Sequence, residues 1–178
     1  DGVLDSAGFG VDGKVFVHWV LRDQANDIDL MEDGKIVAAG MQMTSNSPWA
    51  QIESVYRFNA DGTVDSTFAD SGCVAIRPMT GSSEHGGVKA LPDGRILAGG
   101  RQNLSSPGIH VRRYLSDGTL EGGDLLSIGT GSPSPDPYNP TSCAFPDDGG
   151  IVLASVAYVN GLTQFVLARV DSALNPMA

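Results

Sequence analysis

The chain has 178 residues, with 11 Lys and Arg against 21 Asp and Glu and a formal net charge of −10. Such an acidic surface repels phosphate backbones and anionic lipids, and no apolar run approaches the ~20 residues that span a bilayer, so we expect no nucleic-acid partner and no membrane insertion. The 23 glycines and the charged fraction of 18% favour short strands and tight turns over long amphipathic helices.

The first third of the chain contains four strand-length segments, at residues 13–17, 26–30, 35–41 and 52–58. They are rich in Val, Ile, Phe and Tyr, and they are separated by clusters of Gly, Asp, Asn and Ser. Asp-Gly pairs tolerate positive φ and are favoured in two-residue hairpins, so consecutive strands should run antiparallel. The pattern predicts a four-stranded antiparallel meander.

This pattern recurs along the chain. Three markers repeat in the same order at steps of 54 to 60 residues, which indicates three repeats within a single domain, 1–178. The markers are an Asp-Gly turn (Asp33, Asp93 and Asp148), a second aspartate-led turn (Asp1, Asp61, Asp117 and Asp171), and an arginine within a strand (Arg57, Arg113 and Arg169). The repeats cover about 1–60, 61–116 and 117–178.

The third strand of each repeat is apolar or small throughout, as in IVAAG, ILAGG and IVLAS, so both of its faces should be covered by other sheets. Repeated four-stranded meanders of this length are typical of propeller blades. We therefore predict an all-β fold of three blade-like meanders. Closed propellers use ~4–8 blades, so the fold should be completed by oligomerisation, as a dimer or trimer, or within a longer propeller.

Three stretches carry a family resemblance: DGTVDSTFADSGCVAI (61–76), GGVKALPDGRILAGG (86–100) and IHVRRYLSDGTL (109–120). They resemble the bacterial delta-60 repeat, which is classed among β-propeller repeats. The resemblance implies a large exported protein, often a surface or adhesion protein, and supplies no catalytic residues. The third repeat departs from the pattern, because GGDLLSIG lacks the Phe turn and VDSALNPMA lacks the Asp-Gly, as expected of a capping repeat.

In an antiparallel meander, alternate connections lie at the same end. The Asp-Gly turns should therefore lie at one end and longer, dissimilar loops at the other (18–25, 44–51, 77–85, 101–108, 129–140 and 157–164). Aromatic rings among these loops suit sugar faces or a protein partner, although the two tryptophans would equally pack over the blade ends. The contact candidates are Trp19, Trp49 and Tyr158, with Arg22, Asn46 and Arg101 as polar partners.

Other residue types offer weaker leads. His18 and His85 fall in the loop set near Asp23 and Glu84, but their spacings match no ligand pattern, and no nucleophile elbow or phosphate loop occurs. We expect surface histidines, no metal, no cofactor and no enzymatic activity. An enzyme would instead bring two histidines together with carboxylates in a concave pocket.

The recurring arginines and the cysteines each leave two interpretations. The arginines would line a channel for an anion or tie neighbouring blades together, and their recurrence in every repeat favours the ties. Cys73 and Cys143 would form one disulfide in an exported chain or remain separate buried thiols, and we favour the thiols.

The sequence as a whole predicts a non-catalytic binding or adhesion module at the bacterial cell surface or outside the cell. Its loop-bearing face would recognise a glycan or a cell-surface protein. The alternatives are a structural segment of a fibre or surface protein and a propeller-type hydrolase or lyase.

Overall fold

The structure, a computed structural model, describes residues 2–18, 20–43, 51–76, 82–103, 108–126, 142–159 and 162–175. Within these ranges the chain forms eleven strands and no helix, so the predicted all-β fold is confirmed. In the part of the chain that the structure describes, no helix is long and apolar enough to cross a membrane.

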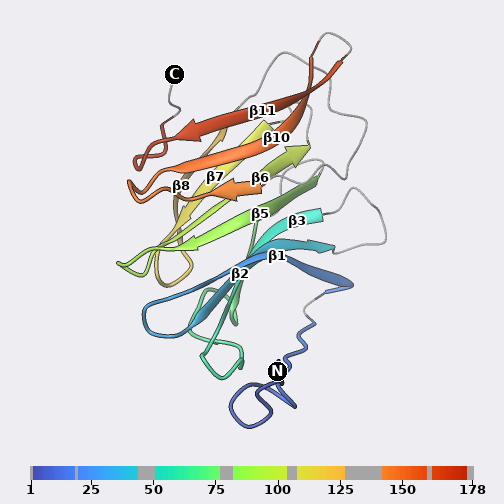
Figure 1. Ribbon diagram of the computed structural model, residues 1–178, viewed down its shortest axis with the longest axis vertical. Helices are drawn as coiled ribbons and strands as arrows, with labels where there is room; N and C mark the ends of the chain where they lie inside the picture. The colour runs from blue at the N-terminus through green and yellow to red at the C-terminus, as the bar shows by residue number, and fades with distance from the viewer. Residues whose placement is uncertain are drawn as a thin grey trace.

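The strands form three antiparallel sheets, each a meander of neighbouring strands (Figure 1). Sheet 1 contains β1 (Arg22–Leu30), β2 (Ile36–Met43), β3 (Gln51–Phe58) and β4 (Cys73–Ile76) in that order. Sheet 2 contains β5 (Ser82–Ala90), β6 (Ile96–Asn103), β7 (Gly108–Tyr114) and β8 (Leu120–Leu126). Sheet 3 contains β9 (Ser142–Ala144), β10 (Ile151–Val159) and β11 (Leu162–Val170).

The sheets are out of phase with the sequence repeats. The expected strand at 13–17 is wrong, because these residues form only an isolated bridge between Val11 and Lys14. The fourth strand of sheet 1 is instead β4, which follows the Asp61 turn and pairs with β3. A strand needs a neighbour for its backbone groups, and none of the described strands lies beside residues 13–17.

The sheets pack face to face through two apolar clusters. Between sheets 1 and 2, Val37 and Val55 meet Val88 and Ile96. Between sheets 2 and 3 lies a second cluster, formed by Leu97, Ile109, Val111, Ile151, Leu153, Val170 and Leu174. Sheet 2 is therefore covered on both faces, as predicted for the run ILAGG, which forms the first part of β6.

The first strands of sheets 1 and 2 are tied together by polar side chains. Asp27 Oδ2 accepts a hydrogen bond from Val88 N at 2.9 Å, and Asp29 Oδ2 accepts one from Ala90 N, also at 2.9 Å. These amides belong to β5, the edge strand of sheet 2. The aspartates thus accept hydrogen bonds from backbone amides of β5 that point away from its neighbouring strand β6.

Two of the three recurring arginines tie neighbouring sheets together, whereas the third, Arg169, contacts only Asp148 of its own sheet among the described acids. Arg57 pairs with Asp65 at 2.7 Å and also donates to the carbonyl of Ser116 in the next sheet's turn. Arg113 does the same with Glu121 and with the carbonyl of Ser172. This is the structural role predicted for them.

The two ends of the sheets differ. The Asp-Gly turns at 31–35, 91–95, 115–119 and 145–150 join strand ends at one end, on the left in Figure 1. The other end carries the connections after Met43, Ile76, Asn103, Leu126 and Val159, which lie largely outside the described residues. The predicted gathering of the Asp-Gly turns at one end is confirmed. The predicted difference in length is not, because the connection 59–72 at the turn end has 14 residues, whereas 104–107 and 160–161 at the other end have four and two. The loop bounds were too wide, because residues 22–25 and 82–85 belong to strands.

Candidate functional site

Three ionisable side chains meet between sheets 1 and 2, a few residues from the loop-bearing end. They are Glu53 on β3, His85 on β5 and His110 on β7. His110 Nε2 lies 2.7 Å from Glu53 Oε2 and 3.2 Å from His85 Nδ1. The two imidazole rings meet edge to face, with centroids 5.0 Å apart.

Two further side chains complete this buried network, and both come from β7. Arg112 Nε donates to Glu53 Oε1, and Tyr114 Oη lies 3.1 Å from His85 Nε2. Because side chains on a strand alternate between its faces, His110, Arg112 and Tyr114 all point towards sheet 1, whereas Val111 packs against sheet 3. The alternation of side chains along β7 therefore places three members of the network on one face of this strand.

The network is closed to solvent, and this shifts its proton equilibria. Glu53 and His110 are each 1% exposed and His85 is 0% exposed. Burial lowers the pKa of His85 to about 3, so its ring is neutral at pH 7. Burial alone would raise the pKa of Glu53, but the neighbouring His110, His85 and Arg112 outweigh it and lower the pKa to about 2.

Two imidazole nitrogens and one carboxylate oxygen, all within 4.8 Å of one another, are a donor set that zinc accepts in proteins. Here the Arg112 guanidinium already neutralises the Glu53 carboxylate, which removes most of the charge that would attract a divalent cation. The contacts among these groups fit a hydrogen-bonded link between the sheets.

The prediction of surface histidines was wrong for two of the three. His85 lies in β5 and not in a loop, and both His85 and His110 are buried. His18 is exposed, as predicted, and lies 3.9 Å from Asp23. Two histidines and a carboxylate therefore do meet, as the sequence analysis expected of an enzyme. They meet in a buried interface between two sheets and not in a concave pocket.

A sequence signal for this network does exist. Glu53 occupies the position at which the second and third repeats have Ile109 and Phe165, 56 residues apart in each step. A charge at a position otherwise apolar calls for a buried partner. Its identity could not be read from the sequence, because the partners come from the next sheet.

Of the six predicted contact residues, the structure describes the side chains of Arg22 and Arg101 and only the backbone of Tyr158. Trp19, Asn46 and Trp49 lie outside the described residues, as does the side chain of Tyr158, whose backbone is near the end of β10. Arg22 is exposed at the start of β1. Arg101 is partly buried on β6 and donates from Nε to Glu84 Oε1 at 2.8 Å, so part of its guanidinium is committed to the sheet.

The cysteines are separate thiols in the structure, as favoured from the sequence. Cys73 is buried on β4, where Gln42 Nε2 donates to its sulfur at 3.2 Å. Cys143 on β9 is partly buried and would clash with a side chain at Gly87 or Gly99.

Comparison with known proteins finds a family to which part of the chain is similar. A family model described as "Domain of unknown function (DUF5122) beta-propeller" matches residues 32–68 and 91–121, which include β2, β3, β6 and β7. The chain is thus similar to this family over 68 of its 178 residues, and its three antiparallel sheets are consistent with propeller blades. No curated protein matches it.

Among solved structures, the chain is similar to a polysaccharide lyase, an ulvan lyase described as bound to -[GlcA(1-4)Rha3S]-. The identity is 9% and the TM-score 0.46, over 85% of this chain and 41% of the lyase chain. The propeller-like domain thus spans about two fifths of the lyase's length. A likeness at this level does not extend to activity.

Proposed function

We propose that this propeller-like domain is a non-catalytic binding module of an exported bacterial surface or fibre protein. Its loop-bearing end contacts a glycan or a cell-surface protein. The exported setting rests on the resemblance of residues 61–76, 86–100 and 109–120 to delta-60 repeats.

The observation that carries the proposal is the difference between the two ends of the sheets. One end is closed by near-identical Asp-Gly turns, in which Asp33, Asp93 and Asp117 each accept a hydrogen bond from the backbone amide two residues on. The other end carries connections that differ in length and sequence from sheet to sheet. A uniform scaffold that presents variable connections is typical of binding proteins.

The absence of catalysis is supported by the burial of the candidate acid–base groups. Glu53, His85 and His110 are at most 1% exposed, so a substrate would reach them only if sheets 1 and 2 separated. General acid–base catalysis needs a group within hydrogen-bonding reach of the substrate. A hydrolase or lyase would need other residues of the chain.

A glycan-array screen with the labelled domain tests the proposal. We expect wild-type binding to be weakened at least tenfold by Trp19→Ala or Trp49→Ala, as for aromatic contacts at the centre of an interface. Arg22→Glu should also weaken binding, because Arg22 is exposed at the same end. The matched control is Arg95→Glu, the same change of charge in the turn at 91–95 at the opposite end.

Three outcomes contradict the binding role at this end. They are no ligand on the glycan array or in a parallel screen of cell-surface proteins, binding unaffected by all three loop-end variants, and binding lost equally in Arg95→Glu. The controls for folding are the circular dichroism spectrum and the urea midpoint of each variant.

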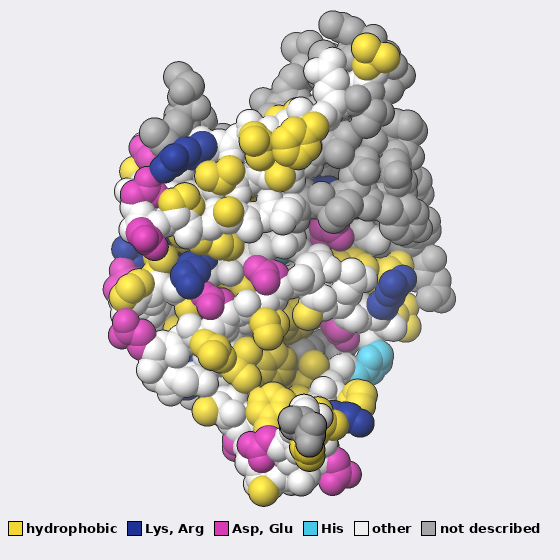
Figure 2. Space-filling view, in the orientation of Figure 1, with side chains coloured by type: hydrophobic (Ala, Val, Ile, Leu, Met, Phe, Trp, Pro, Cys, Tyr) yellow, Lys and Arg dark blue, Asp and Glu magenta, His cyan; other side chains and the backbone are white. Residues whose placement is uncertain are grey.

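A second candidate function is a purely structural segment that spaces or joins repeats along a fibre. It is favoured by apolar side chains exposed on the outermost strands, Ile28 and Leu30 on β1 and Phe165 and Leu167 on β11. Figure 2 shows apolar side chains over the upper part of the molecule, where β11 runs, and lower down near β1. This alternative predicts self-association in the absence of any ligand for the loop-bearing end.

A further inference from the structure

Residues 5–14 repeat the turn and the bridge of residues 65–73, although they belong to no sheet. The lone bridge between Val11 and Lys14 repeats the bridge between Asp70 and Cys73, 59 residues on. Positive φ also recurs at this step: Gly10 and Asp12 have φ of 56° and 52°, and Ala69 and Ser71 have 48° and 59°. The segment is thus preformed as the entry to a fourth strand.

This segment also sits on sheet 1 as residues 65–76 sit on sheet 2. Gly10 N donates to the carbonyl of Asp61 at 2.8 Å, and Ala69 N donates to the carbonyl of Asp117 at 2.7 Å. Residues 65–76 bridge two sheets, because they rest on the turn of sheet 2 while β4 completes sheet 1. Residues 5–17 rest on the turn of sheet 1, but the sheet that they would complete is missing from the described part of the chain.

In the described part of the chain, sheet 3 lacks the fourth strand that sheets 1 and 2 have. Its order is β11–β10–β9, so none of the described strands pairs with the outer edge of β11. In sheets 1 and 2 the corresponding edge is occupied by β4 and β8. If residues 14–17 took this place with the register of β4 on β3, Val15 would face Leu167, as Val74 faces Val55.

Sheets 1 and 3 each expose apolar residues on their outer faces, and the equivalent residues of sheet 2 are buried against a neighbouring sheet. Phe165 and Leu167 are 71% and 62% exposed, whereas their equivalents in sheet 2, Ile109 and Val111, are each 1% exposed. At the other extremity, Ile28 and Leu30 of β1 are 65% and 68% exposed. Their equivalents on β5, by the paired registers with β2 and β6, are Val88 and Ala90, at 2% and 8%.

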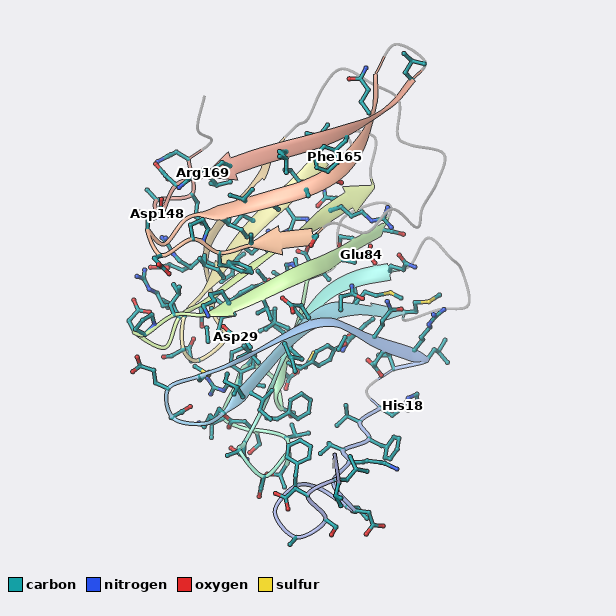
Figure 3. All side chains as sticks on the ribbon, in the orientation of Figure 1. His18, Asp29, Glu84, Asp148, Phe165 and Arg169 are labelled. Atoms are coloured by element: carbon teal, nitrogen blue, oxygen red, sulfur yellow. The ribbon has the colours of Figure 1, made fainter. Side chains whose placement is uncertain are left out.

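The arginine–acid pairs of sheets 1 and 2 also suggest what sheet 3 would pair with. Arg57 and Arg113 each pair with an acid eight residues on, Asp65 and Glu121. Arg169 is the third such arginine, and it contacts only the exposed Asp148 among the described acids (Figure 3).

Asp5 is the acid that corresponds to Asp65. Its Oδ1 accepts hydrogen bonds from Ala7 N and Gly8 N, much as Asp65 Oδ1 accepts from Thr67 N. No basic side chain among the described residues pairs with Asp5. Arg169 and Asp5 therefore fit as the two halves of one inter-sheet pair.

We propose that two copies of this chain close a ring of six sheets, in which residues 14–17 of each copy add as the fourth strand beside β11 of the other. Phe165 and Leu167 of one copy then cover Ile28 and Leu30 of its partner. Six is the only multiple of three sheets within the ~4–8 of closed propellers. The outer edge of β11 in each copy, beside which no described strand lies, then gains a strand. This inference does not depend on the binding role proposed above.

The mass in solution tests the ring. Size-exclusion chromatography with light scattering should give about 37 kDa, twice the 18.5 kDa of one chain. Phe165→Arg should give a monomer with an unchanged circular dichroism spectrum, because this side chain is exposed in the single chain. The matched control is Leu120→Arg, an exposed apolar position on β8 outside the proposed interface, which should remain dimeric.

Charge exchange tests the specific contact. Asp5→Arg and Arg169→Asp should each raise the dimer dissociation constant at least tenfold, since each places like charges together. The double variant Asp5→Arg/Arg169→Asp should return it to within about threefold of wild type. In Val15→Cys/Leu167→Cys, mild oxidation should give a covalent dimer, and Val15→Cys alone should not.

The following results would overturn the proposal: a wild-type monomer at every concentration tested, a closed trimer, equal masses for Phe165→Arg and Leu120→Arg, or a double charge variant that is no better than the single ones. A covalent dimer absent from the double-cysteine variant would overturn the register of the added strand.

Discussion

Acidification from pH 7 to pH 5 is expected to destabilise the fold through His85. Its ring is fully buried, and burial lowers its pKa to about 3 from the ordinary 6.5. Between these two values the unfolded chain binds a proton that the folded chain does not. The free energy of unfolding therefore falls as the pH drops below about 6.5, and the loss is complete only near pH 3.

The two pKa values set the size of the effect. Between pH 7 and pH 5, proton binding to the unfolded imidazole lowers the free energy of unfolding by about 2 kcal/mol. Glu53, whose pKa is lowered to about 2, acts in the same direction but adds only about 0.2 kcal/mol in this range, because an unfolded glutamate is mostly ionised at pH 5. Of these two groups, His85 therefore accounts for most of the expected loss of stability between pH 7 and pH 5.

Urea unfolding of wild type and His85→Asn at both pH values, at one protein concentration, measures this contribution. The variant should be less stable at pH 7, because the contacts with His110 and Tyr114 are lost. Its loss on acidification should be about 2 kcal/mol smaller than that of wild type. His18→Asn, at an exposed histidine, should keep the wild-type loss. Equal losses in wild type and His85→Asn would refute a buried, neutral His85.

Three further predictions concern the contacts between sheets. Arg57→Ala should lower the free energy of unfolding by roughly 1–3 kcal/mol, measured by urea denaturation, because the carbonyl of Ser116 loses its donor and the buried Asp65 keeps only Lys35 as an ion-pair partner. Asp27→Ala should speed amide hydrogen exchange at Val88, whose N–H loses its acceptor. Burial raises the pKa of Cys73 to about 12, so this thiol should react with a disulfide reagent at pH 8 only after unfolding.

Each of these has a control within the chain. Arg95→Ala removes an ion-paired arginine at the surface and should lower the free energy of unfolding by less than Arg57→Ala does. Exchange at Ala98, in the middle of sheet 2, should not respond to Asp27→Ala. An equal loss of stability in Arg57→Ala and Arg95→Ala, unchanged exchange at Val88, or rapid labelling of native Cys73 would contradict the respective contact.

Local sequence patterns predicted much of the fold because hairpins depend on neighbouring residues. The Asp-Gly turn at 33–34 joins β1 to β2, and Gly34 has the positive φ of 83° that the turn requires. The strand expected at 13–17 failed for a non-local reason. Its sequence is suited to a strand, but a strand forms only beside a neighbour, and no described strand pairs with residues 15–17.

The candidate site was predicted less well, for a related physical reason. Arg22 and Arg101 were predicted as loop residues but lie on β1 and β6, where Arg22 is exposed and Arg101 donates to Glu84. The environments of His85 and His110 were not predicted either, because burial depends on which sheet faces them.

The sequence by itself determined the repeat, the antiparallel meanders and the structural use of the recurring arginines, since each is written in residues close together or at a constant step. Only the tertiary structure decided which strands share a sheet, that Glu53 meets two histidines, and that no described strand pairs with the outer edge of β11 or with residues 15–17. These facts arise from contacts between side chains about 25 to 60 residues apart, whose energies depend on burial and distance and not on order along the chain.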